Sequence, residues 1–149
     1  MITIDDIAAA ISARLIAATG YSASLPGQAW FRRASDPPPN WPYSVFLVEK
    51  AGDDEMLSDG DYLQGFTIRI SSYYRQGLDT PNAAPLFLLS AINTAPTVWS
   101  PLRGAPANSI LHCLPQAWDG KFDTNLRQGR GVFVPVGQWE MLTNGDLTS

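Results

Sequence analysis

The sequence has very little of the side-chain chemistry that most enzyme active sites use. It contains one cysteine, Cys113, and one histidine, His112, in 149 residues. A single cysteine excludes an internal disulfide and is typical of a reducing compartment. It also excludes zinc sites built from cysteine and histidine ligands. The two residues are sequence neighbours, so in a strand they point to opposite faces and do not form a catalytic dyad.

Motifs for phosphate binding and serine hydrolysis are also missing. Gly129-Arg130-Gly131 is too short for a phosphate-binding loop, and no Gly-x-Ser-x-Gly pattern occurs. A hydrolase with two catalytic carboxylates stays as an alternative, because Asp and Glu total 14, although their spacing does not single out a pair. We therefore expect no cofactor, no metal ion and no catalytic residue, and the protein is predicted not to be an enzyme.

Long apolar runs are absent as well. No stretch approaches the roughly 18 to 20 apolar residues that cross a bilayer, and the first six residues lack the basic region of a secretion signal. The sequence predicts a protein that is soluble and intracellular when made, with no membrane partner. A net charge of -4 disfavours general binding to nucleic acid.

The sequence does contain enough apolar residues for a hydrophobic core, because they make up 45% of the chain. We expect a single domain over residues 1–149. Its first 20 residues are expected to form a helix that ends at Gly20. Thr3 and Asp6 form a capping-box pattern at its start. Apolar residues spaced by three and four predict one buried stripe: Ile4, Ile7, Ile11 and Leu15.

Residues 21–42 change character, because prolines become frequent and three of them, Pro37 to Pro39, are consecutive. Such a segment is predicted to be an extended arm, after a short strand near residues 28–33. The arm carries Trp30, Phe31 and Trp41. These aromatic side chains either fold back on their own core or anchor in a neighbouring subunit.

Residues 43–142 are predicted to hold the sheet and a second helix. The segment 43–48 is apolar at nearly every position, as in an interior strand covered on both faces. Phe66, Ile68 and Ile70 alternate with polar residues, which predicts an antiparallel partner with one wet face.

A second helix is expected at about 83–93, with Pro85 in its first turn and with an apolar face of four residues: Leu86, Phe87, Leu89 and Ile92. A short strand at 110–114 should end at Pro115. A last strand at 132–141 contains Pro135, which indicates an edge or a bulge, and residues 143–149 should fray.

The fold class predicted is therefore α/β (α+β): a mostly antiparallel sheet of about four to five strands, two helices packed on one face, and a proline-rich extended arm. The loop between the first two sheet strands is the most acidic window, with Asp53, Asp54, Glu55, Asp59 and Asp61. Its spacing does not fit a calcium-binding EF-hand loop. We interpret it as a solvated hairpin loop.

The order of these elements resembles that of the tail terminator, or tail completion, proteins of long-tailed bacteriophages. The resemblance covers about the first two thirds of the chain and includes Pro42-Tyr43-Ser44-Val45-Phe46, Ser58-Asp59-Gly60-Asp61-Tyr62 and Phe66-Thr67-Ile68-Arg69-Ile70. It implies a structural virion protein that forms a ring, typically hexameric, on the end of the tail tube. Such a ring halts tube polymerisation and offers a surface to the head connector.

The same resemblance implies the partners and the location. These are further copies of the chain, the phage tail tube protein and the head-tail connector proteins, with DNA only passing through the lumen. The protein would occupy the virion tail, and the host cytoplasm during assembly. The hypothetical subunit interface has two parts, the arm residues Trp30, Phe31, Arg32, Arg33 and Trp41, and the charged residues Asp53, Asp54, Asp59, Asp61, Arg127 and Arg130. Arg127 and Arg130 either meet the acidic loop of a neighbour or face the lumen.

Three other functions stay open. The chain could be another head-to-tail connector, neck or minor tail protein, and the sequence does not separate these positions. A small carboxylate-dependent hydrolase would need a deep pocket that holds both acids. A monomeric ligand-binding domain would need its tryptophans to converge on one cleft.

Overall fold

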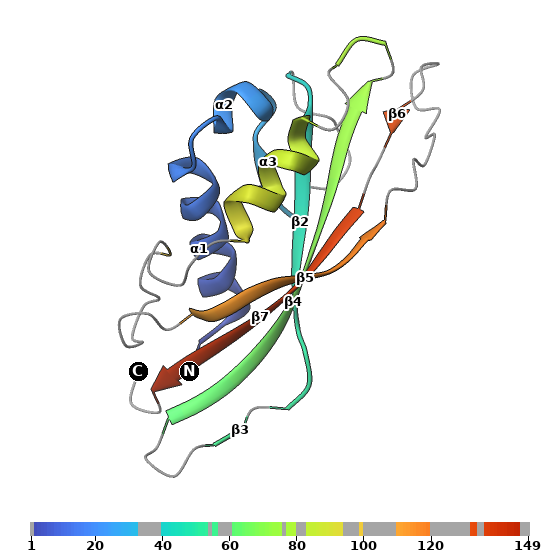
Figure 1. Cartoon of the computed structure of the whole chain (residues 1–149). Helices are drawn as coiled ribbons and strands as arrows, with labels where there is room; N and C mark the ends of the chain where they lie inside the picture. Colours follow the sequence, from blue (N-terminus) through green and yellow to red (C-terminus); the bar gives the residue numbers. More distant parts are fainter. Residues whose placement is uncertain are drawn as a thin grey trace.

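A computed structural model of the chain shows one long twisted sheet with helices on one of its faces (Figure 1). The structure describes the following residues: 2–32, 40–53, 55–56, 61–75, 77–79, 83–93, 99, 110–119, 132–133 and 136–146. Within these, only the backbone is described for residues 61–62, 112, 116–119, 132–133 and 145–146. The predicted mixture of helices with a mostly antiparallel sheet agrees with this architecture.

The helices are α1 (Ile4–Ala17), α2 (Tyr21–Ser24) and α3 (Ala83–Ile92). The strands are β1 (Ala29–Phe31), β2 (Tyr43–Lys50), β3 (Glu55–Met56), β4 (Asp61–Arg75), β5 (Ile110–Asp119), β6 (Val132–Phe133) and β7 (Val136–Asp146). The main sheet order is β1-β2-β4-β7-β5, while β3 and β6 pair with β4. Of the described strand pairs, only β1 and β2 run parallel. The sheet thus has more strands than the four or five predicted.

Helix α1 follows the sequence pattern closely. Thr3 Oγ1 accepts the Asp6 N–H at 3.2 Å while Asp6 Oδ2 accepts the Thr3 N–H at 2.8 Å, so the capping box is formed. Ile7, Ile11 and Leu15 are fully buried against the sheet. The helix ends at Ala17, three residues before Gly20, because Ala18 is extended and Gly20 instead precedes α2 with φ 89°.

Helix α3 lies beside α1, and Arg14 Nε of α1 donates to the Ala91 carbonyl at 2.9 Å. The predicted apolar face is partly wrong. Leu86 is 65% exposed, whereas Leu88, which the pattern left out, is fully buried. The helix is rotated so that Leu88 faces the core together with Ala84 and Ala91. The two alanine side chains are small, so the helix backbone packs closely on its neighbours. No helix in the described part is long and apolar enough to cross a bilayer.

Strands β2 and β4 form the predicted antiparallel pair, with Phe46 opposite Ile70 and Val48 opposite Ile68. The prediction that β2 is covered on both faces is wrong. Phe46 and Val48 are buried, but Leu47 between them is 41% exposed. Its apolar sequence therefore does not reflect two-sided burial.

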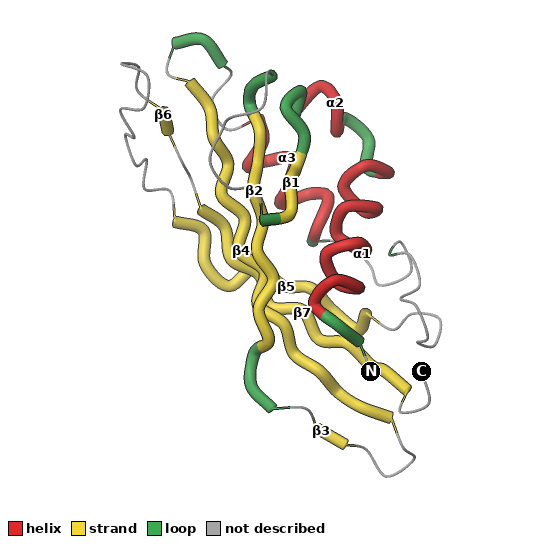
Figure 2. The backbone as a smooth tube through the Cα atoms, turned by 180° about the vertical axis from the view of Figure 1, so that it is seen from behind, coloured by secondary structure: helices red, strands yellow, loops and turns green. Residues whose placement is uncertain are grey.

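Strand β7 is interior, because it lies between β4 and β5 (Figure 2). The edge position proposed for the last strand is therefore wrong, and Pro135 lies outside the described residues, between β6 and β7. The frayed tail is also wrong for residues 143–146. Thr143 is fully buried, and Asn144 pairs with Leu63 of β4.

Strand β5 is an edge strand and continues past Pro115 to Asp119, with register irregularities between Ile110 and His112 and between Pro115 and Ala117. Proline has no backbone N–H to donate to a neighbouring strand. It is therefore tolerated in an edge strand, which has a neighbour on one side only. Cys113 faces the helices and is buried, as expected of a small apolar side chain.

Residue Gln64 is a buried polar side chain that ties β4 to the start of the chain. Its Oε1 accepts the Ile2 N–H at 3.1 Å, and its Nε2 donates to the Ile2 carbonyl at 3.2 Å. Thr143 Oγ1 of β7 donates to the Gln64 carbonyl at 3.1 Å. Each of these polar groups has a hydrogen-bond partner. Their burial therefore avoids the free-energy cost of a buried polar group that lacks one.

The short strand expected near residues 28–33 is confirmed as β1. Residues 21–25 differ from the expected extended arm, because they include α2 and because Leu25 is fully buried in the core. Gly27 N–H donates to the Pro42 carbonyl at 2.9 Å, and a side chain at Gly27 would collide with the Asn40 carbonyl. The two ends of the proline-rich segment therefore lie together, while the prolines at 37–39 lie outside the described residues.

Candidate subunit interface

Strand β1 is a short edge strand held between two left-handed residues. Gln28 has φ 68° and Arg32 has φ 54°, a conformation that non-glycine residues seldom adopt. Backbone hydrogen bonds hold both ends to β2: Ser44 N–H donates to the Gln28 carbonyl at 3.0 Å, and Arg32 N–H donates to the Phe46 carbonyl at 3.2 Å. Backbone strain of this kind costs about 1 to 3 kcal/mol per residue and often accompanies function.

The side chains of β1 form a small aromatic and cationic edge. Trp30 Nε1 donates to the Gly27 carbonyl at 2.7 Å, and the half-buried Phe31 ring packs 5.4 Å from that of Phe46. The exposed Arg32 guanidinium lies over the Phe31 ring, 4.5 Å from its centroid. Trp30 and Phe31 therefore pack on their own domain with part of their surface, while Arg32 faces solvent.

Trp41 belongs to a second cluster, at the end of the sheet where β2 starts and β4 stops. Its ring meets Tyr43 edge-on at 4.8 Å, and Tyr43 stacks on Tyr73 at 4.9 Å. The Arg75 guanidinium lies 5.4 Å from the Trp41 ring centroid and binds Asp79 through two hydrogen bonds, of 3.1 and 3.0 Å. The hydrogen bond to Asp79 raises the pKa of Arg75, although burial opposes this.

The sequence did not single out Tyr73, Arg75 or Asp79 for this cluster. The four-residue spacing of Arg75 and Asp79 was a visible signal, but it suggests pairing only on a helix, and these residues lie in a strand end and a turn. The stack of Tyr43 on Tyr73 depends on the strand register, which no local pattern contains.

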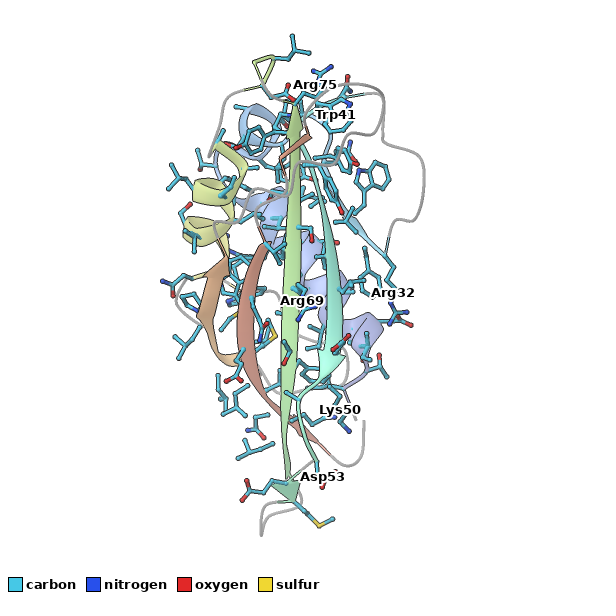
Figure 3. All side chains as sticks on the ribbon, turned by 90° about the vertical axis from the view of Figure 1, so that its right-hand side faces the viewer. Arg32, Trp41, Lys50, Asp53, Arg69 and Arg75 are labelled. Atoms are coloured by element: carbon cyan, nitrogen blue, oxygen red, sulfur yellow. The ribbon has the colours of Figure 1, made fainter. Side chains whose placement is uncertain are left out.

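The acidic residues lie at the opposite end of the sheet from Trp41 and Arg75 (Figure 3). Asp53 and Glu55 are exposed there. The backbone of Asp61 pairs with Asp146, and its side chain is not described. The other interface residues named from the sequence lie outside the described residues: Arg33, Asp54, Asp59, Arg127 and Arg130.

The face of the sheet that lacks helices among the described elements carries mixed side chains, and we call it the open face. Arg69 lies near its middle (Figure 3), beside Leu47 on β2 and Gln138 on β7. A shallow hollow on it is lined by Leu47, Glu49, Thr67 and Arg69, and another near the acidic end is lined by Ala51, Gly65, Phe66, Glu140, Met141 and Leu142. Each of these hollows has one carboxylate, whereas paired-carboxylate hydrolysis uses two.

The described tryptophan side chains do not converge on one cleft. Trp99 and Trp139 are buried in the core, Trp30 lies on the β1 edge and Trp41 at the end of the sheet. In the described part of the chain, no three His, Cys, Asp or Glu residues are grouped so as to hold a metal ion. The described tryptophans are therefore divided among the core, the β1 edge and one end of the sheet.

Comparison with solved structures shows a likeness in fold. No protein-family model matches the chain, and no curated protein matches it. A virion chain shares its fold. This solved chain, from the "virion of native gene transfer agent (GTA) particle", aligns with a TM-score of 0.66 and 17% identity over 92% of our chain and 93% of its own. A second solved structure aligns at a TM-score of 0.49 with 17% identity, over 93% of our chain and 95% of its own.

Proposed function

We propose that this protein is a structural virion protein, and more specifically a tail terminator that forms a ring on the end of a phage tail tube and contributes to head-tail joining. The observation that carries the proposal is the fold shared with a virion chain over nearly the full length of both chains. The resemblance in element order to tail terminators, drawn from the sequence alone, agrees with it. The virion tail is the proposed location, with the host cytoplasm during assembly.

The surface of the subunit suits a ring. A closed ring of identical subunits needs two different complementary patches on each copy. The β1 edge offers Trp30 and Arg32, which are residue types enriched at interfaces, and the acidic end of the sheet offers a patch of different character. The partners proposed are neighbouring copies, the tail tube protein and the head-tail connector proteins, with DNA only passing through the lumen.

Native mass and electron microscopy test the proposal directly. The purified chain is measured by analytical ultracentrifugation and negative-stain microscopy, alone and with added tail tubes. We expect closed rings, and rings bound to one end of each tube. A chain that stays monomeric and leaves tube ends bare under both conditions would contradict the proposal.

A matched pair of variants shows whether the β1 edge closes the ring. Trp30→Ala should keep the folded domain but impair ring closure, because Trp30 lies on the β1 edge and tryptophan is enriched among residues that dominate interface energetics. Leu86→Ala removes a more exposed apolar group, on α3, and should leave rings intact. Loss of the domain's circular dichroism in Trp30→Ala would show that Trp30 is a core residue instead.

A different virion position is the second candidate, because the similar chain is known as part of a virion particle and not by its place within that particle. A connector, neck or minor tail protein would form the same kind of contacts with other partners. Binding of the rings to isolated head connectors but not to tube ends would favour this candidate.

A further inference from the structure

The Arg32 guanidinium is a positioned cation without a carboxylate partner among the described residues. Its backbone is fixed in the left-handed region by the hydrogen bond to Phe46, and its head group is supported by the Phe31 ring. By contrast, Arg75 binds Asp79 and Arg14 binds the Ala91 carbonyl. Little side-chain freedom would be lost if a carboxylate approached Arg32 from outside, which favours binding there.

Complementary groups lie elsewhere on the same molecule. Asp53 and Glu55 are exposed beyond the end of β2, and neither has an ion pair within the described part of the chain. Figure 3 places Arg32 beside the middle of the sheet and Asp53 at its lower end, so the two do not meet within one chain. A second copy can bring its acidic end to Arg32.

We propose that Arg32 of one copy binds Asp53 and Glu55 of the next copy, so that the sheets join side to end. This pairing rests on the proposed self-association. It adds two different patches, so that each copy binds the next copy in one fixed orientation. Each copy has a net charge of -4, so copies repel unless opposite charges are matched at the contact. A guanidinium forms two parallel hydrogen bonds with a carboxylate, which fixes orientation as well as affinity.

Charge reversal tests the pairing. Arg32→Glu should weaken self-association by about tenfold or more, because it places like charges against each other, and Asp53→Arg with Glu55→Arg should do the same. Combining all three changes should restore association, since the ion pair is re-formed with opposite polarity. Arg69→Glu, an equal charge change at an exposed arginine of the open face, serves as the control and should leave association unchanged.

Disulfide trapping tests the geometry even where association is weak. Cys113 is buried and should not react, so cysteines placed at Arg32→Cys and Asp53→Cys are the accessible thiols that the test needs. A mixture of the two single variants should give a crosslinked dimer on mild oxidation. Each variant alone should give at least about tenfold less, because like patches do not meet in a heterologous contact.

The outcomes separate this inference from the proposed function. The pairing would be overturned if the wild type formed rings, Arg32→Glu had the same native mass and the mixed cysteine variants gave no crosslink. The proposed ring would still stand in that case. Equal weakening by Arg32→Glu and Arg69→Glu would overturn it too, because net charge alone would then explain the loss. Normal rings of Arg32→Glu that no longer bind tube ends would assign Arg32 to the tube protein and overturn contact between copies.

Discussion

The two faces of the sheet differ sharply although the same strands build both. On the face covered by α1 and α3, Phe46 of β2 is fully buried, while its neighbour Leu47 on the open face is 41% exposed (Figure 2). The covered face is apolar apart from paired groups such as Ser44 and Ser72, whereas the open face carries Arg69 among its exposed side chains. The hydrophobic core that includes Phe46, Ile68 and Ile70 therefore lies on the covered face, whereas the middle of the open face presents exposed side chains.

The largest loss of stability should come from removing a large buried side chain from the covered face. Phe46→Ala should lower the free energy of unfolding by about 3 to 5 kcal/mol, because it leaves a cavity among fully packed side chains. Urea denaturation followed by circular dichroism measures it. Leu47→Ala, one residue along β2, should cost less than about 1 kcal/mol, and an equal loss in both variants would abolish the distinction between the faces.

A smaller effect is expected from the buried hydroxyl pair of the covered face. Ser44 and Ser72 hydroxyl oxygens lie 3.0 Å apart and are inaccessible to solvent. Ser72→Ala should cost about 1 to 3 kcal/mol, because the Ser44 hydroxyl loses its partner in a dry environment. The double variant Ser44→Ala with Ser72→Ala should cost less than the sum of the single changes. Ser71→Ala on the open face is the matched control, and a loss there as large as in Ser72→Ala would contradict the prediction.

The buried thiol gives the covered face a pH dependence. Burial raises the pKa of Cys113 to about 12 from an ordinary value of 9.0. Above pH 9 the thiol ionises in the unfolded chain but stays protonated in the folded one, so the unfolded state binds fewer protons and stability falls as pH rises from about 9 to 12.

The slope should approach about 1.4 kcal/mol per pH unit between these values. The free energy of unfolding is measured at several pH values for the wild type and for Cys113→Ala. Other groups that titrate between pH 9 and 12 contribute equally to the two proteins, so the difference between the curves isolates the thiol. Parallel stability curves would show that the thiol does not contribute.

The smallest effect should come from the exposed charge at the centre of the open face. Arg69→Gln should change the free energy of unfolding by no more than about 0.5 kcal/mol, since Arg69 is exposed and forms no ion pair with a described residue. Thermal or urea unfolding measures it. A loss above 2 kcal/mol would mean that this face is also needed for folding.

The parts of the fold that the sequence predicted depend on local periodicity. The stripe of α1, its capping box and the alternation of Phe66, Ile68 and Ile70 are each contained within a few consecutive residues, and all were confirmed. The position of α3 was predicted too. Its rotation was not, because whether Leu86 or Leu88 is buried depends on how the helix packs against α1.

The features that were missed depend on pairing between distant segments. An interior β7 and its extension past Leu142 require β4 to be long enough to pair as far as Asp61 with Asp146. Strand β5 passes Pro115 because it is an edge strand, which only the sheet order reveals. At the candidate interface, Trp30, Phe31 and Arg32 were named from residue type, and their role in subunit contact stays a prediction. The contact of Arg75 with Trp41 was not predicted, since it joins segments 34 residues apart.

The side-chain amide of Gln64 helps to fix the register of β4 in the sheet. Because one face of β4 is helix-covered, a shift of one residue would exchange the two faces and bring Leu63 or Gly65 to the Ile2 backbone. Neither replacement can both accept and donate through a side chain, so the Ile2 N–H and carbonyl would be stranded. Misaligned sheets are thereby penalised at the point where α1 begins, and the correct arrangement is selected by complementarity as well as by packing.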